Sequence, residues 1–346
     1  MLPWYIGLFL PNEVICAILC WLPVVSLLRF KSVCRHWNSI TQDCKFINEH
    51  ICRSPGLWVH KTISTTPTSQ AEYVCLTSCT GLTLEAGTFT RKFRLRNPST
   101  RKILDLPEPN RTVYRDSNIA MCYVPSTSDV KLVYPYSNAV SYGCCKILTA
   151  GTDPAWRKID LSFCCNPANF NVETILIDNV YYVMRLSGDQ EMFCLEMENE
   201  QLSRIKIPRY FFLDWTRVWS VEWRGKLSLA CIEDDGIHLW VLENWREQKW
   251  AENKNDITGE LFSEDYKSRN MVPCLFEDEG WLVHCNHERI VHLLMEAVSG
   301  KGLDSQDKPA RRIFSYYFEP SLLHVKGMQR DRIKEFFNYK DTITFN

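Results

Sequence analysis

The chain has 346 residues, of which 45% are hydrophobic and 12% aromatic, a composition typical of a globular protein and not of a largely disordered one. Its length allows one large domain with a small one, or two domains of middle size. The formal net charge of −1 at pH 7 gives no long-range attraction to nucleic acid or anionic lipid, so we expect neither nucleic acid nor a membrane among the partners.

Sixteen cysteines raise the question of redox state. Several lie in apolar runs such as residues 14–20, where a reduced thiol behaves as a small hydrophobic side chain. No C-x-x-C spacing, the one used by the strongest zinc motifs, occurs in the sequence. We therefore expect free thiols, no cofactor and a cytoplasmic or nuclear location. The alternative is a secreted binding domain stapled by disulfides.

The apolar start of the chain invites comparison with a signal peptide or membrane anchor, since Glu13 is the one charged residue before Arg29. No basic residue precedes the apolar run, and Pro11 and Pro23 interrupt it. The uncharged stretch 14–28 is shorter than the roughly 20 residues that a membrane-spanning helix needs. The pattern favours short helices.

Apolar residues at helical spacing predict a first helix ending at Pro23, a second starting there, a short third over 37–40 and a fourth over 44–51. Part of the apolar surface must form a small helical core. The number of large apolar side chains nevertheless exceeds what such short helices can bury against one another, which favours a surface for a partner.

The pattern Leu10-Pro11-x-Glu13, the stretch 18–30 and Val33-Cys34-x-x-Trp37 resemble, in order and spacing, the F-box of plant F-box proteins. The resemblance implies a three-helix unit over 1–52 that binds the Skp-family adaptor of a cullin-based ubiquitin ligase. Trp21 and Val25 depart from the family pattern, which usually has a polar and a basic residue there, and both make the surface more apolar. Carried over by position, the expected adaptor contacts are Leu10, Pro11, Ile15, Leu22, Pro23, Leu27 and Val33, whereas Phe30, Cys34 and Trp37 are expected in the unit's own core.

Residues 53–70 are predicted to be a joint or an irregular first strand. From residue 71 to residue 346, short apolar or alternating segments separated by turn residues predict an all-β domain. The expected strands include 130–134, 174–182, 192–195, 218–223, 227–231 and 237–242.

A weak internal repeat makes the fold prediction more specific. Segments 103–107, 156–161, 202–208 and 248–250 recur at intervals of roughly 43–55 residues, near the length of a propeller blade. Each follows a hydrophobic strand, as the outer strand of a four-stranded blade would. We therefore predict a β-propeller-like fold. The alternative is an irregular β-sandwich, because the double glycines of Kelch repeats and the WD signature are missing.

The β-rich region also resembles the F-box-associated domain of plant F-box proteins, through residues 78–82, 96–101, 151–159, 221–229 and 240–250. With the F-box, the resemblance spans essentially the whole chain. It implies a non-catalytic interaction module, so that the chain would be the substrate-recognition subunit of an SCF-type (Skp–cullin–F-box) ubiquitin ligase. A second hypothesis is a propeller enzyme that carries an F-box-like amino terminus.

No motif identifies a catalytic residue. His284-Cys285-x-His287 with His292 is the best metal candidate by residue type, but neighbours in a strand point to opposite faces, so we interpret it as a solvated strand edge. The acidic stretches 234–235 and 277–279 precede glycine and are explained as turns. We predict no metal site and no catalytic site.

Tryptophans concentrate between residues 215 and 250, and one polar-aromatic segment among them suggests a binding role. Trp and Arg are the side chains that most often anchor protein interfaces. We therefore expect some of the target-binding surface at Phe211, Asp214, Trp215 and Arg217.

Overall fold

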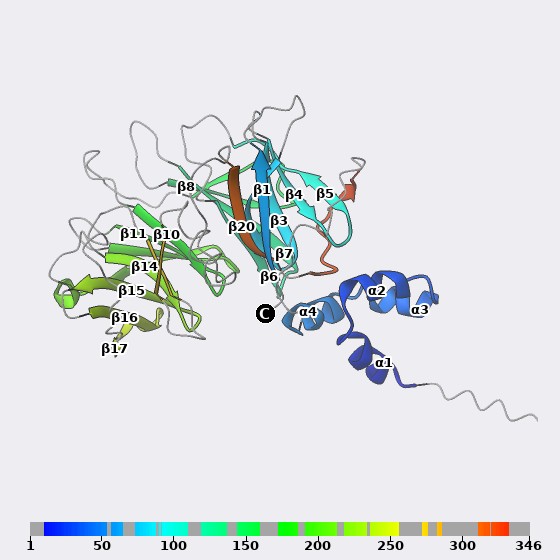
Figure 1. Cartoon of the computed structure of the whole chain (residues 1–346), viewed down its shortest axis with the longest axis horizontal. Helices are drawn as coiled ribbons and strands as arrows, with labels where there is room; N and C mark the ends of the chain where they lie inside the picture. The colour runs from blue at the N-terminus through cyan, green and yellow to red at the C-terminus, as the bar shows by residue number, and fades with distance from the viewer. Residues whose placement is uncertain are drawn as a thin grey trace, which may run out of the picture.

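The structure is a computed structural model that shows a small helical unit beside a larger array of antiparallel sheets (Figure 1). None of the helices it describes is both long and apolar enough to cross a membrane. The residues it describes are 10–53, 57–64, 73–87, 90, 92–109, 119–136, 144–159, 172–185, 191–212, 218–233, 236–255, 272–275, 282–285, 311–318 and 320–331.

Four short helices form the amino-terminal unit, one more than the F-box resemblance implies: α1 (Asn12–Leu19), α2 (Val24–Phe30), α3 (Arg35–Ile40) and α4 (Cys44–Arg53). Pro11 and Pro23 stand at the N-caps of α1 and α2 with φ of −54° and −57°, and neither ring disturbs a helical hydrogen bond there. The Asp43 carboxylate accepts the backbone N–H groups of Lys45 and Phe46 at 2.9 and 3.1 Å and so caps α4.

Four sheets follow in which consecutive strands are antiparallel neighbours. We number them sheet 1 to sheet 4. Sheet 1 contains β2 (Tyr73–Cys79), β3 (Leu82–Gly87), β4 (Phe93–Asn97) and β5 (Lys102–Asp105); sheet 2 contains β6 (Ala120–Val124), β7 (Asp129–Tyr136), β8 (Cys144–Thr149) and β9 (Arg157–Ile159). Sheet 3 contains β10 (Val172–Ile177), β11 (Val180–Arg185), β12 (Glu191–Glu196) and β13 (Gln201–Lys206); sheet 4 contains β14 (Val218–Trp223), β15 (Lys226–Glu233), β16 (Gly236–Asn244) and β17 (Lys249–Asn255).

The remaining strands form smaller pairings. β18 (Val272–Leu275) pairs with β19 (Leu282–Cys285), β1 (Leu57–Ser64) pairs with β20 (Arg311–Phe318), and the short β21 (Gln329–Arg330) adds to the outer edge of β5. β1 lies within the segment predicted as a joint or irregular first strand, and its eight residues pair regularly with β20. The β-rich domain therefore includes residues well before position 71.

The sheets follow one another around a common centre. Their first strands β2, β6, β10, β14 and β18 are successive neighbours, and β20 lies beside β2. The β1–β20 pair thus joins an early strand to a late one next to sheet 1. The segments of the internal repeat fall on β5, β9, β13 and β17, the last strand of each four-stranded sheet. The β-propeller-like prediction is confirmed, and the arrangement is not that of a sandwich of two sheets.

The apolar core lies between neighbouring sheets. In β7, Leu132 is buried in the cluster shared with sheet 1, whereas Val133 is buried in the cluster shared with sheet 3. Successive residues of a strand point to opposite faces, so a sheet packed between two others needs apolar residues on both faces. A further cluster, around Met184, Met192 and Leu229, fills the space between sheets 3 and 4.

One expected strand is a hairpin. The stretch 174–182 divides into β10 and β11, and Asp178 and Asn179 between them have φ of +47° and +58°. A two-residue turn with positive φ at both positions suits the twist of a hairpin, and Asp and Asn tolerate that conformation better than most residues. The continuous apolar character on both sides concealed this turn in the sequence.

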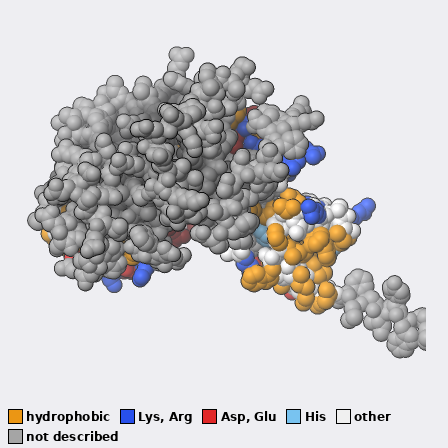
Figure 2. Space-filling model, viewed as in Figure 1, with side chains coloured by type: hydrophobic (Ala, Val, Ile, Leu, Met, Phe, Trp, Pro, Cys, Tyr) orange, Lys and Arg blue, Asp and Glu red, His pale blue; other side chains and the backbone are white. Residues whose placement is uncertain are grey.

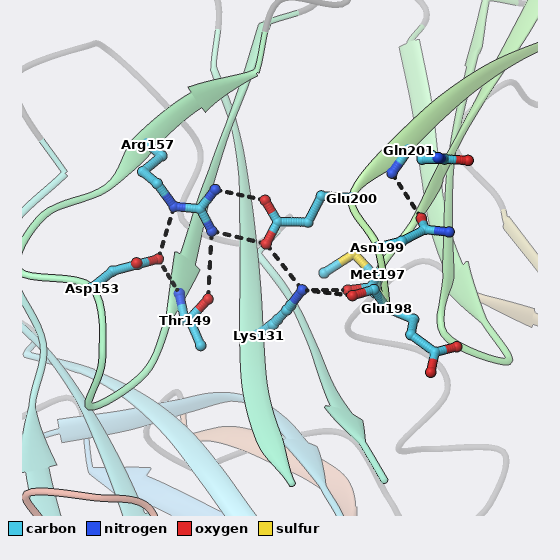
Figure 3. Close-up of polar contacts among 9 residues, drawn as sticks. All are labelled: Lys131, Thr149, Asp153, Arg157, Met197, Glu198, Asn199, Glu200 and Gln201. Atoms are coloured by element: carbon cyan, nitrogen blue, oxygen red, sulfur yellow. Dashed lines mark hydrogen bonds and ion pairs between the residues drawn. The ribbon is translucent and has the colours of Figure 1, made fainter. Parts of the chain in front are cut away.

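A network of charged groups joins sheet 2 to the β12–β13 turn of sheet 3 (Figure 3). The Lys131 ammonium, nearly buried, donates to the main-chain oxygens of Met197 at 2.6 Å and Glu198 at 3.2 Å, and to the Glu200 carboxylate at 2.9 Å. Arg157 donates to both oxygens of the same carboxylate at 2.6 and 2.8 Å. The hydrogen bonds from Arg157, assisted by those from Lys131, hold the pKa of Glu200 at about 2 against an ordinary 4.5.

We predict that Glu200→Gln lowers the free energy of unfolding at about pH 7 by about 1–3 kcal/mol, since charge-assisted hydrogen bonds are lost. Because the folded-state pKa of Glu200 is below its ordinary value, its contribution is complete above about pH 4.5 and declines as the pH falls toward 2. The difference between variant and wild type should therefore shrink on acidification. Denaturant unfolding at several pH values measures it.

Glu198→Gln is the matched control for this prediction. Glu198 lies in the same turn, but it joins the network through its main-chain oxygen, and Figure 3 shows its carboxylate pointing away from Lys131. Equal losses of stability in the two variants would contradict the role assigned to the Glu200 carboxylate.

Candidate functional site

Exposed apolar side chains concentrate on the helical unit. Of the eight large hydrophobic residues that are exposed among the described residues of the chain, six lie between residues 10 and 33. We call them the helical apolar patch, and Figure 2 shows apolar side chains gathered over the helices. Their exposed fractions run from 40% to 74%, and the residues are Leu10, Val14, Ile18, Trp21, Val25 and Val33.

The residues expected to contact an adaptor divide into three groups. Leu10, Pro11, Pro23 and Val33 are exposed, and Ile15 and Leu22 are half-buried against the core. Leu27 has 0% exposure, because it faces inward from α2 together with Val24, and it belongs to the core of the unit instead of its surface.

The adaptor contacts expected from the sequence do not include Val14, Ile18, Trp21 and Val25, although the structure exposes all four. Trp21 and Val25 stand where the F-box pattern usually has a polar and a basic residue, and this departure could have identified both as surface residues. Trp21 is 74% exposed, and the Arg53 guanidinium of α4 lies 5.3 Å from its ring centre. This distance is that of a cation–π contact, and Arg53 also pairs with Glu49 at 2.7 Å.

The residues expected in the core of the helical unit are placed differently from one another. Phe30 and Trp37 are half-buried and meet edge to face with ring centres 5.4 Å apart, as expected for core residues. The prediction that Cys34 lies in the core is wrong, because its side chain is exposed. Its backbone is extended at the N-cap of α3, which directs the thiol to accept the Trp37 N–H at 3.4 Å.

The expected target residues are only partly described. Phe211 is 7% exposed and stacks on Trp240 with ring centres 3.8 Å apart, which places it in the core between sheets 3 and 4 and not on a surface. Asp214, Trp215 and Arg217 lie outside the described residues. Tyr210, next to Phe211, is 79% exposed and was not foreseen.

The strand order divides the surface of the β-rich domain into two faces. The turns between the first and second, and between the third and fourth, strands of each sheet lie on one face, which we call the turn face. Many of these turns contain non-glycine residues with positive φ, including Thr80, Arg101, Ser128, Glu200 and Gln248. Within sheets 1 to 4, the strand ends joined by the remaining connections, among them the connection from β13 to β14, lie at the opposite face, which we call the loop face.

The helical unit contacts the turn face. The Tyr123 hydroxyl, near the end of β6, donates to the Asn48 side-chain oxygen of α4 at 2.5 Å. The Asn48 amide nitrogen donates to the Pro125 carbonyl at 3.4 Å. The loop face therefore points away from the helices.

The structure gives limited information on the metal candidates. His284 and Cys285 belong to β19 but their side chains are not described, and His287 and His292 lie outside the described residues, as do the acidic stretches 234–235 and 277–279. Among the described side chains, no group of three or more His, Cys, Asp or Glu residues could hold a metal ion.

The described cysteines are free thiols, some of them buried between sheets. Burial raises the pKa of the Cys122 thiol to about 12, so it stays protonated at neutral pH. Cys34, Cys44 and Cys52 are exposed on the helical unit.

We predict that Phe211→Ala destabilises the chain by about 3–5 kcal/mol, because a buried ring is replaced by a cavity. Tyr210→Ala, its exposed neighbour, should cost less than about 1.5 kcal/mol, the scale of its edge contacts with Phe211 and Trp240. Thermal and denaturant unfolding measure both. A Phe211 variant as stable as wild type would contradict the assignment of this residue to the core.

Comparisons with known proteins agree with this architecture. A family model described as F-box domain matches residues 8–49, and one described as F-box associated beta propeller domain matches residues 29–287. The chain is 25% identical over 258 residues to putative F-box protein At5g50220 of Arabidopsis thaliana, covering 70% of this chain and 69% of that protein. It is 26% identical over 292 residues to putative F-box protein At3g10240 of the same plant, covering 70% of each.

Two further similarities are local or weak. Putative F-box only protein 11 of Arabidopsis thaliana is 42% identical over 55 residues, which are 16% of this chain and 15% of that protein. Virginiamycin B lyase from Staphylococcus aureus aligns over 66% of this chain and 67% of its own with 12% identity and a TM-score of 0.37. The F-box match and the propeller match, which covers more than half of the sequence, show that this chain belongs to the F-box proteins with an F-box-associated β-propeller domain.

Proposed function

We propose that the chain is the substrate-recognition subunit of an SCF-type ubiquitin ligase. Its F-box binds a Skp-family adaptor, and through it a cullin, while its propeller holds a target protein. The observation that carries this proposal is the helical apolar patch, which lies in the domain matched as an F-box. Contiguous exposed apolar side chains on a folded domain mark a surface that a protein partner covers.

The form of the patch supports a protein partner. Pro11 and Pro23 fix the starts of α1 and α2, so the apolar side chains stand on ordered backbone, and the Arg53 guanidinium makes a cation–π contact with the Trp21 ring at 5.3 Å. An ordered surface loses little conformational entropy on binding, which favours affinity. An exposed tryptophan within it is the kind of side chain that contributes most to protein interfaces.

The target is proposed to bind at the loop face. The F-box occupies some of the turn face through Asn48 and Tyr123, which leaves the opposite face accessible. The connection from β13 to β14 begins at that face, and Tyr210 within it is exposed. We include Tyr210 with Asp214, Trp215 and Arg217 in the proposed target surface.

The chemical role of the chain in this proposal is tethering, with bond formation left to other subunits. Holding a target near the ubiquitin-loaded conjugating enzyme raises the effective concentration of its lysines. The absence of a catalytic motif in the sequence supports a receptor over a propeller enzyme. The free thiols among the described residues support a reducing location, cytoplasmic or nuclear, over a secreted disulfide-stapled domain.

The adaptor assignment is tested on exposed residues, whose replacement leaves the core intact. We expect the double variant Ile18→Ala/Trp21→Ala to bind a purified Skp-family adaptor at least roughly 30-fold more weakly, since interface anchors contribute about 2 kcal/mol or more. Isothermal titration calorimetry on the full chain measures the affinity, and circular dichroism checks the fold.

Leu202→Ala is the matched control, because Leu202 is an exposed apolar residue of β13, far from the helices in sequence and outside the F-box. It should bind the adaptor as wild type does. A folded Ile18/Trp21 variant with unchanged adaptor affinity would remove the main support for the proposed function.

A further inference from the structure

The segment 320–331 lies beyond the residues matched as the F-box-associated propeller, which end at residue 287. Five of its side chains are nevertheless buried, namely Ser321, Leu322, Leu323, Val325 and Met328. A segment with so much buried apolar surface contributes to the fold. Its contacts show which parts of the fold it joins.

Hydrogen bonds fasten this segment to the turn face of sheet 1. The Ser321 hydroxyl donates to the Thr80 carbonyl in the β2–β3 turn at 2.5 Å. The Asn97 amide, at the end of β4, donates to the carbonyls of Ser321 and Leu323 at 3.2 and 2.8 Å. Asn97 is fully buried, so these bonds satisfy a side chain that water cannot reach.

The far end of the segment continues along the same sheet and reaches sheet 2. β21 pairs with β5, and the Asp331 N–H donates to the Arg101 carbonyl at 3.0 Å. Gly151, in the β8–β9 connection, has φ of +74°, and a Cβ placed there would stand 2.1 Å from the Lys326 carbonyl oxygen. Only glycine permits this approach between the segment and sheet 2.

The F-box shares the core that this segment completes. One continuous cluster of buried apolar side chains contains Leu19 and Phe46 of the helices, Leu95 and Leu132 of sheets 1 and 2, and the apolar side chains of segment 320–331. Figure 1 shows the segment, in red, beside β5 on the side of the F-box helices. The Lys102 Nζ lies 3.5 Å from the His324 Nδ1, and burial together with the positive charges of Lys102 and of Lys31, the C-cap residue of α2, lowers the pKa of His324.

We propose that segment 320–331 is a brace, which together with the Asn48–Tyr123 contact fixes the F-box on the turn face of the propeller. Asn48 and Tyr123 are positioning residues, because they connect the two domains without belonging to the helical apolar patch. A flexible linker would let the bound target explore a wide volume, whereas a docked F-box holds it at one distance from the ligase. That consequence, though not the docking itself, rests on the proposed function.

Hydrogen–deuterium exchange of the full chain tests the brace. In Asn48→Ala/Tyr123→Phe, amides of α4 and of residues 320–331 should exchange roughly fivefold faster, the effect of losing about one net hydrogen bond. Amides of sheet 3 should be unchanged. Tyr210→Phe removes an exposed hydroxyl elsewhere and should change exchange in neither α4 nor segment 320–331.

A second variant changes the contact between segment 320–331 and sheet 2 instead of the contact between α4 and sheet 2. Gly151→Ala forces the Lys326 carbonyl away and should loosen segment 320–331 directly. If the segment is a brace, exchange in α4 must rise as well, although α4 itself is unaltered. Faster exchange in 320–331 with unchanged exchange in α4, or no change in either from the Asn48/Tyr123 variant, would overturn the proposal.

Adaptor affinity separates this inference from the proposed function. All three substituted positions lie outside the helical apolar patch, so each variant should bind a purified Skp-family adaptor as wild type does. Small-angle scattering of these complexes should show a broader distance distribution for the variants. Failure of the wild-type chain to bind the adaptor would refute the proposed function and leave the docking of the F-box to be judged by exchange alone.

Discussion

The packing of each sheet against both of its neighbours is the constraint on which this structure depends. In β7, neighbouring residues Leu132 and Val133 are buried on opposite faces of one sheet. A sheet with two apolar faces cannot be stable alone, so the sheets must follow one another closely and the connecting turns on one face must be short. The positive φ values of Arg101, Ser128 and Gln248 show that those turns are tight. The F-box and segment 320–331 rest on that compact face, and the opposite loop face is the one that we propose for target recognition.

Charged side chains supplement this apolar packing at particular contacts. Glu200 lies at the end of the turn after β12 and reaches back to Lys131 and Arg157 of the preceding sheet. One sheet further on, Arg246 in the turn after β16 pairs with Glu196 of its preceding sheet. The Lys131 ammonium is nearly buried, and a buried charge is stable only when paired, so its pairing with Glu200 favours one relative position of sheets 2 and 3 where apolar packing alone would allow several. Within sheet 1, by contrast, the buried Arg94 and Glu85 meet at 2.6 Å between the neighbouring strands β3 and β4.

Much of this architecture is predictable from sequence because it depends on local patterns. Prolines and apolar spacing indicated the helices, and the recurring segments fell on the outer strands β5, β9, β13 and β17. The errors came from long-range burial. Whether Leu27 and Phe211 face a core or solvent depends on segments distant in the chain, as does the burial of 320–331 against Thr80 and Asn97. The Asp178–Asn179 turn was missed for a local reason, since apolar residues continue through both strands beside it.

We propose that an adaptor covers the exposed apolar side chains of the F-box. Carbene footprinting of the intact chain, with and without a purified Skp-family adaptor, tests it most directly. We expect adaptor binding to protect the helical apolar patch, Trp21 above all, while Tyr210 and Leu202 on the propeller stay as reactive as in the free chain. Protection confined to the propeller, with the patch equally reactive in both states, would contradict it.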